Sequence, residues 1–203
     1  MQELVFYPSP SSADMNSDHS RPSTPEPSLS GSLILADPSL RDPSFFRTVL
    51  ILTDHGKKSG ARGYVLNRPM ERTVGDFLSS KEFSEVWEVP VFSGGPVAGN
   101  ELMFISFNWN GPRNRIQWSE PLGLQGAKKM LSAGGEVRGF LGYAGWTAGQ
   151  LEDEIQRKAW IRRAPPKEVL DTEVGGELWT QLLTSMGPFY QLLAKTPVDP
   201  GLN

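Results

Sequence analysis

The chain has 203 residues, of which 38% are hydrophobic and 21% are charged, a composition typical of one globular domain with a core of its own. Its formal net charge of −3 offers no general attraction to nucleic acid, so direct binding of DNA or RNA is not expected. The absence of cysteine excludes disulfides and thiol chemistry, and two histidines are too few for a histidine-built zinc site. We therefore expect neither a metal nor another cofactor.

No apolar run is long enough to span a membrane, and the first residues lack the basic-then-apolar pattern of a signal peptide. We therefore expect a cytoplasmic protein. Residues 8–30 are rich in Pro and Ser and have almost no apolar side chains, so they cannot bury enough surface to offset the entropy of ordering. The sequence thus predicts a disordered tail over residues 1–30 and a single domain over residues 31–203.

Short apolar runs rich in β-branched residues predict strands through most of this domain. The predicted strands cover residues 31–36, 48–53, 62–67, 89–93, 101–107, 115–118 and 137–143. The second and third of these strands are expected to pair as a hairpin. Capping residues and terminal glycines predict helices over residues 74–80, 122–133, 178–186 and 189–194.

The best-marked helix follows a segment rich in glycine and aromatic residues. Thr147 and Gln150 have the spacing of a capping box, and the acidic residues that follow suit the positive end of the helix macrodipole. The basic residues 157–163 are placed in its last turns, which predicts a helix that continues to Arg163. The glycines over residues 142–149 predict a sharp turn before the helix. Alternatively, the N–H groups of such an entry could hold an anion.

Several motifs match a known family in the family's own order. They are GSLILADPSL at residues 31–40, FFRTVLILTDHG at 45–56, GYVLNRP at 63–69, FSGGPV at 92–97 and LGYAGWTAGQLEDEI at 141–155. On these motifs the chain resembles the bacterial YqgE/AlgH proteins, many of which carry the label of transcriptional regulator. The resemblance implies an α/β fold with a mixed, partly barrel-like sheet surrounded by helices. The family's biochemical role is poorly defined, so no reaction is implied.

One position departs from the family pattern. Many relatives have a Leu-His pair in the strand after the GGPV motif, where this chain has Ile105 and Ser106. A histidine acting at that position is therefore not expected here.

Polar residues and glycines at the ends of the predicted strands and at the helix entry form a candidate ligand-binding set. Its members are Asp37, Asp42, Arg47, His55, Asn67, Arg68, Gly94, Gly95, Trp146 and Gln150. As a functional set, the planar arginine forks could bind a small anion or carboxylate. As a structural set, the aspartates would cap turns before proline, and the arginines would bind loop carbonyls. Either role remains open at this point.

Catalysis has weaker support in the sequence. His55 is the one histidine of the predicted domain, and a triad with Asp37 or Asp42 lacks a Gly-x-Ser-x-Gly nucleophile elbow. The leading hypothesis is therefore a noncatalytic cytosolic binding or regulatory protein that acts on an unknown protein partner or small ligand. One alternative is an enzyme or small-anion binder built on the Asp/Arg/Asn loops. The other is a DNA-binding regulator, which rests on the family label and the basic segment 157–163.

Overall fold

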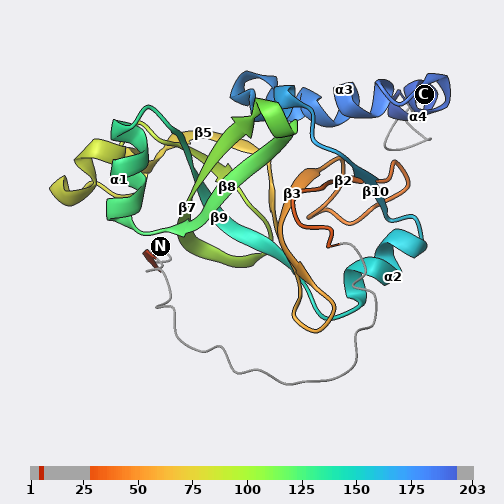
Figure 1. Cartoon of the computed structure of the whole chain (residues 1–203), viewed down its shortest axis with the longest axis horizontal. Coiled ribbons are helices and arrows are strands. Elements are labelled where there is room, and N and C mark those ends of the chain that lie inside the picture. The colour runs from red at the N-terminus through yellow and green to blue at the C-terminus, as the bar shows by residue number, and fades with distance from the viewer. Residues whose placement is uncertain (1–4, 7–27, 196–203) are drawn as a thin grey trace.

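The computed structural model describes residues 5–6 and 28–195, so most of the predicted N-terminal tail lies outside the described residues. The chain forms a mixed α/β structure in which one large sheet curls into a partial barrel with helices around it (Figure 1). The fold class implied by the family resemblance is confirmed. Figure 1 shows α1 and α2 at opposite ends of the sheet, with α3 and α4 along one side.

The strands account for most of the regular structure. They are β1 (Val5–Phe6), β2 (Leu33–Ala36), β3 (Val49–Gly56), β4 (Gly60–Val65), β5 (Pro69–Thr73), β6 (Pro90–Ser93), β7 (Val97–Asn110), β8 (Arg115–Leu122), β9 (Glu136–Trp146) and β10 (Trp160–Arg163). Along the main path of the sheet the order is β1-β7-β9-β4-β3-β2-β10. In addition, β8 pairs with β7, and β6 pairs with both β5 and β9. The predicted hairpin of β3 and β4 is confirmed, with an antiparallel register that joins Ile51 to Tyr64.

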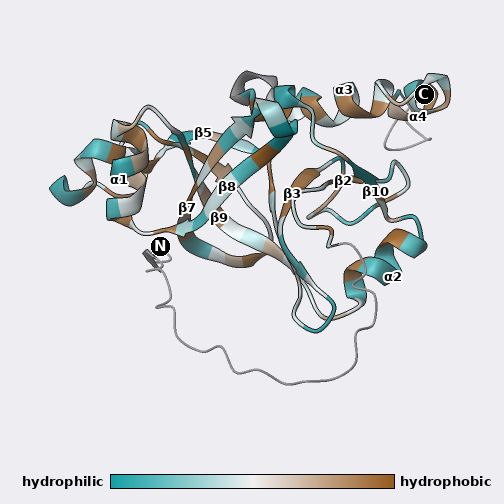
Figure 2. Cartoon of the chain, viewed as in Figure 1, coloured by the Kyte–Doolittle hydropathy of each residue, from teal (hydrophilic) through white to brown (hydrophobic). Residues whose placement is uncertain are grey.

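Both faces of the central strands are buried, which explains their unbroken apolar sequences. Every residue of β2 is buried, and so are the first five residues of β3. One face contributes Leu33, Leu35, Val49 and Ile51 to a core shared by both halves of the sheet and α3. The other face packs against residues from α2 and β10. Figure 2 shows hydrophobic residues along β2 and β3 and hydrophilic residues at the tip of the β3–β4 hairpin.

The helices are short. The α-helices are α1 (Leu124–Ser132), α2 (Gln150–Gln156), α3 (Leu178–Thr184) and α4 (Pro188–Ala194), and the 3-10 helices are η1 (Val74–Asp76), η2 (Lys81–Val86), η3 (Gly111–Arg113), η4 (Lys167–Leu170) and η5 (Thr172–Glu177). The predicted helix over residues 74–80 is only the single turn η1. The indole N–H of Trp87 donates to the Leu78 carbonyl at 2.9 Å, which fixes the chain in an irregular loop after this turn. Among the described residues, no helix has the length and apolar character needed to cross a membrane.

The central helix is shorter than predicted. The side-chain oxygen of Gln150 accepts from the Thr147 N–H at 3.0 Å, as the capping pattern predicts, but α2 ends at Gln156. Lys158 then adopts a left-handed backbone with a φ of 62°, and the chain continues as β10 beside β2. The prediction of helix as far as Arg163 is therefore wrong. The strand places Trp160, only 4% exposed, in the core below α2, and this burial favours it over a longer helix.

The predicted turn before the helix is a bent strand. Gly142 and Gly145 both lie within β9, which continues to Trp146. At Gly142, with a φ of 70°, an added Cβ would lie 2.5 Å from the Gly95 carbonyl oxygen. A side chain would therefore prevent the close approach of β9 to the segment between β6 and β7. Glycine here serves close strand packing and not a chain reversal.

Candidate functional site

The predicted aspartates lie in the loop between β2 and β3, where each carboxylate caps a local turn. Oδ1 of Asp37 accepts from the backbone N–H of Ser39 at 2.9 Å and from its hydroxyl at 2.6 Å. Oδ1 of Asp42 accepts from the Ser44 N–H at 2.7 Å. Such bonds stabilise the loop conformation without help from a ligand.

Arg68 connects this loop to the start of β5. Its guanidinium donates to the carbonyl oxygens of Ser44 at 2.7 Å, Phe46 at 3.2 Å and Pro43 at 3.3 Å. Burial lowers the pKa of Arg68, and the nearby charge of Asp42 opposes that shift. The fork that could bind an anion is thus directed at main-chain oxygens of the protein itself.

Asn67 and Arg47 complete this group of loop residues. The buried Asn67 side chain accepts from the Val49 N–H at 2.8 Å and donates to the Arg47 carbonyl at 2.9 Å. The Arg47 guanidinium lies 5.2 Å from the ring centroids of both Phe46 and Trp179. The structure therefore brings Asp37, Asp42, Arg47, Asn67 and Arg68 to one region of the β2–β4 sheet. Their hydrogen bonds described here go mainly to main-chain atoms.

The two predicted glycines lie where strands approach each other closely. A Cβ at Gly94 would lie 2.2 Å from the Gly142 carbonyl oxygen, and one at Gly95 would lie 2.3 Å from the Tyr143 carbonyl carbon. The Gly94 carbonyl also accepts from the Val65 N–H at 3.0 Å. Gly94 and Gly95 thus pack the segment after β6 against β9 and β4.

His55 lies at the opposite end of β3 from the aspartate loop. Its Nδ1 accepts from the Leu29 N–H at 3.2 Å, so in the neutral ring the proton is on Nε2. Nε2 then donates to Glu152 of α2 at 3.0 Å. The imidazole has a carboxylate partner from the central helix and none from Asp37 or Asp42. Both ring nitrogens are therefore hydrogen-bonded within the protein.

Trp146 and Gln150 belong to a network centred on Glu154. One oxygen of this carboxylate accepts from the indole N–H groups of Trp146 at 2.9 Å and Trp160 at 2.7 Å. The other accepts from the Gln150 amide at 2.9 Å. The Phe45 ring packs on both indoles, with centroid distances of 6.3 and 5.4 Å. The network fixes α2 to β9 and β10.

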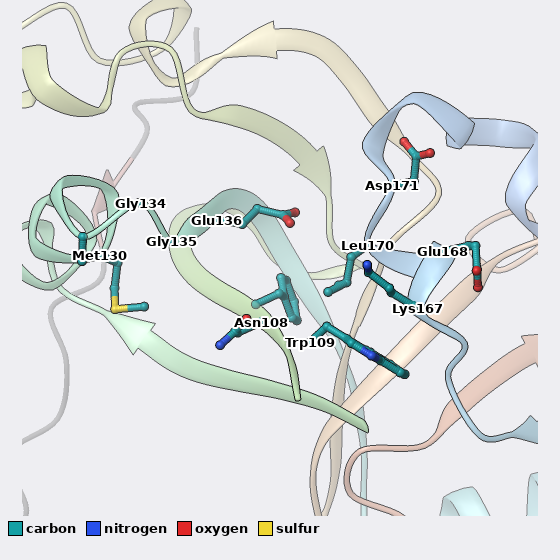
Figure 3. Close-up of a pocket in the computed structure, with 12 residues that line it drawn as sticks. Asn108, Trp109, Met130, Gly134, Gly135, Glu136, Lys167, Glu168, Leu170 and Asp171 are labelled. Carbon is teal, nitrogen blue, oxygen red and sulfur yellow. The ribbon is translucent and has the colours of Figure 1, made fainter. Parts of the chain in front are cut away.

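A separate cavity of about 800 Å³ lies among the β7–β8 hairpin, the loop after α1, the start of β9 and η4 (Figure 3). Its lining consists of Phe107, Asn108, Trp109, Met130, Ala133, Gly134, Gly135, Glu136, Lys167, Glu168, Leu170 and Asp171. Figure 3 shows Trp109 and Lys167 toward one side and the turn at Gly134 and Gly135 toward the other. The cavity is therefore lined by aromatic side chains, charged side chains and main-chain groups together.

A buried arginine lies against this cavity. Arg138 is 1% exposed, and its guanidinium donates to Oε1 of Glu136 at 2.6 and 2.7 Å and to the Leu170 carbonyl at 2.5 Å. The rings of Phe92 and Phe107 lie 5.2 and 5.5 Å from it. Burial lowers the pKa of Arg138, whereas the Glu136 carboxylate raises it. The guanidinium thereby holds Glu136 and η4 at fixed positions on the cavity wall.

None of the predicted candidate ligand-binding residues lines this cavity. The available signal was Arg138, because a charged residue in the interior of an apolar strand implies a buried partner. The lining itself comes from three separate segments, within residues 107–109, 130–136 and 167–171, and has no local pattern. Among the described residues, no group of three or more His, Cys, Asp or Glu side chains is placed to hold a metal ion.

Comparison with known proteins agrees with the geometry of the fold. A family model described as AlgH-like matches residues 33–191. A UPF0301 protein from Chlorobium phaeobacteroides is 33% identical over 189 residues, covering 86% of this chain and 95% of that protein. A UPF0301 protein from Parabacteroides distasonis is 35% identical over 185 residues, covering 86% and 91%.

Two solved structures share the fold. A crystal structure of a Corynebacterium diphtheriae protein has a TM-score of 0.65 at 20% identity, covering 84% of this chain and 93% of that one. The solution structure of the AlgH protein from Pseudomonas aeruginosa has a TM-score of 0.57 at 23% identity, covering 90% and 100%. Together with the match over residues 33–191, these relatives show that the chain belongs to the AlgH-like, UPF0301 family, whose function is uncharacterised.

Proposed function

We propose that this chain is a noncatalytic binding protein of the cytosol and that the cavity beside Arg138 is its binding site. The observation that carries the proposal is the cavity itself. Its volume of about 800 Å³ lies within the range of roughly 300–1,000 Å³ typical of small-molecule sites. Its wall combines the aromatic and apolar surface of Phe107, Trp109 and Leu170 with several charged groups that can orient a polar ligand.

The hydrogen bonds made by the candidate residues outside the cavity favour binding over catalysis. Both ring nitrogens of His55 are hydrogen-bonded, and Arg68 is directed at loop carbonyls. Neither residue lines the cavity. A small ligand or a side chain of a partner protein therefore finds a recognition surface there that includes neither His55 nor Arg68.

An indirect regulatory role, through a partner, is compatible with this proposal and direct DNA recognition is less so. Arg162 and Arg163 lie in strand β10 and not in a recognition helix. Arg162 donates to the Ser32 hydroxyl at 3.2 Å, and Arg163 donates to the Leu182 carbonyl at 2.5 Å. These bonds hold the basic side chains against the protein.

The proposal is tested by ligand-observed NMR with a metabolite and peptide library on the full-length protein. Binding that is lost in Trp109→Ala and kept in Trp118→Ala would support the cavity as the site, because Trp118 lies outside its lining. Native mass spectrometry of protein recovered from its host would report natural ligands and partners together. Turnover in a broad hydrolase screen, abolished by His55→Ala or Arg68→Ala, would overturn the noncatalytic assignment.

A further inference from the structure

One histidine joins the segment before β2 to the central helix. The Nδ1 atom of His55 accepts from the Leu29 N–H at 3.2 Å, and its Nε2 bonds to Oε1 of Glu152 on α2 at 3.0 Å. The imidazole is well shielded, with 10% of its side chain exposed, whereas the Glu152 side chain is 40% exposed. A nitrogen that accepts an N–H cannot carry a proton itself, so these two bonds require the neutral ring with its proton on Nε2.

The segment of residues 28–30 depends on this acceptor. Among the hydrogen bonds described for its main chain, the bond from the Leu29 N–H to His55 is the one that reaches β3. The Ser30 N–H bonds within the segment, to the Ser28 hydroxyl at 3.2 Å, and the Leu29 carbonyl accepts from the N–H three residues later. The remaining bonds from the segment to β3 come from the Ser28 and Ser30 hydroxyls.

The chain on either side of this bond is held in different ways. From Gly31 onward the main chain bonds to β3, beginning with the Gly31 N–H, which donates to the Leu52 carbonyl at 2.7 Å. The Leu29 side chain is 9% exposed and belongs to the core cluster that also contains Leu151 of α2. Residues 28–30 thus cover part of this core, and their main chain is attached to β3 through one imidazole nitrogen.

Protonation of His55 reverses the role of that nitrogen. A protonated Nδ1 is a donor, so it faces the Leu29 N–H with an N–H of its own and the hydrogen bond is lost. The bond to Glu152 persists and becomes charge-assisted on both sides. A proton on the ring is therefore favoured by α2 and opposed by the docked segment. Because the proton binds more tightly once the segment has moved away, acid shifts the equilibrium toward the undocked segment.

The charged side chains of the elements around His55 are few. They are Glu152 on α2, Asp54 on β3, Lys57 in the turn after β3, and Arg62 on β4. In the β3–β4 ladder, uncharged Ala61 lies opposite His55, and Arg62 lies opposite Asp54. Residues 28–30 contribute no ionisable side chain. Of these charged groups, Glu152 is the one with a described hydrogen bond to the ring.

We propose that His55 is a pH-sensitive switch: the neutral imidazole holds residues 28–30 on β3, and protonation releases them while the ring stays bound to Glu152. Release exposes the part of the core that Leu29 covers and frees the chain before Gly31 from this point of the domain. Imidazole is the side chain that ordinarily changes charge between about pH 5 and 8, so a change of pH within that range operates the switch.

The test is amide hydrogen exchange followed by NMR on the full-length protein between about pH 5 and 8, with the ring nitrogen shifts of His55 recorded in parallel. The His19→Ala background leaves one imidazole to observe. We expect the Nε2–H tautomer at high pH. As the ring protonates, the protection factor of the Leu29 amide should fall about tenfold, because its acceptor is lost. The Leu50 amide, in the β3 ladder, should keep its protection.

His55→Gln is the matched variant, because its amide can accept from Leu29 and donate to Glu152 without titrating. The protection of Leu29 should then be independent of pH. This variant keeps Glu120, whose pKa is raised by burial, so any effect of that carboxyl appears in both proteins. Glu152→Gln removes the charge that favours the proton and should move the release to lower pH, whereas Asp153→Asn on the same helix should not.

Four results would each overturn the proposal. The first is constant protection of Leu29 while the ring shifts report protonation. The second is an equal loss of protection in His55→Gln. The third is a neutral ring with its proton on Nδ1, and the fourth is a ring that stays neutral down to about pH 5. If His55→Gln folds poorly, the opposite expectations for Glu152→Gln and Asp153→Asn keep the switch open to refutation.

Discussion

Removing the carboxylate of Glu154 is expected to loosen the aromatic network that holds α2 on the sheet. Glu154→Ala leaves the indole N–H groups of Trp146 and Trp160 without their acceptor, and these residues are 6% and 4% exposed. Each lost hydrogen bond to a charged group costs about 1.5–3 kcal/mol, and the Gln150 bond at the surface adds little. We expect a loss of about 3 kcal/mol in the free energy of unfolding and a fall in Tm of roughly 6–12 °C.

Equilibrium unfolding in urea, followed by far-UV circular dichroism and by tryptophan fluorescence, measures this loss. Glu152→Ala is the matched control on the same helix. Its carboxylate is 40% exposed and pairs with His55, so its removal should cost less than about 1 kcal/mol. If the two variants lose the same stability, the indole bonds contribute nothing special and the reasoning is refuted.

Three further outcomes are expected. Burial raises the pKa of Glu120 in the folded protein above its value in the unfolded chain. Between these two pKa values the folded protein holds the proton and the unfolded chain does not, so the stability of the wild type falls as the pH rises through this window. Urea unfolding across pH should therefore show Glu120→Gln gaining on the wild type within that window, and a pH-independent difference would contradict the shift. Gly94→Ala forces a Cβ to within 2.2 Å of the Gly142 carbonyl and should cost more than about 4 kcal/mol or prevent folding; a soluble variant with a wild-type Tm would disprove the contact. Arg68→Lys loses the fork that binds three loop carbonyls and should cost about 1–2 kcal/mol, with faster hydrogen exchange over residues 43–46; unchanged exchange there would argue against the anchor.

Most of the sheet was predictable because its strands are locally marked. β2 and β3 are apolar runs between turn residues, and burial on both faces demands that composition. The strand β10 was not predictable in the same way. Its basic residues continue the charge pattern of α2, and only the left-handed Lys158 and the burial of Trp160 separate the two elements. Tertiary packing therefore overrides a local helix signal.

The candidate sites show the same difference between residues that are marked locally in the sequence and residues that only the fold brings together. The loop residues around Arg68 were found because they stand beside strand ends in sequence. The cavity was not found, because its lining comes from segments that are distant along the chain. The buried carboxyl of Glu120 was not found either, because it lies beyond the short strand predicted over residues 115–118, in the extension of β8 to Leu122.

The pairing of β10 with β2 has a consequence for synthesis on the ribosome. Leu33 pairs with Arg163 and Ala36 with Trp160, so β2 meets one of its two sheet partners only after residue 163 has left the exit tunnel. Until then the apolar face that β2 and β3 share with α2 lacks its cover. Pairing over such a sequence separation slows folding and prolongs the exposure of unpaired, aggregation-prone strand edges.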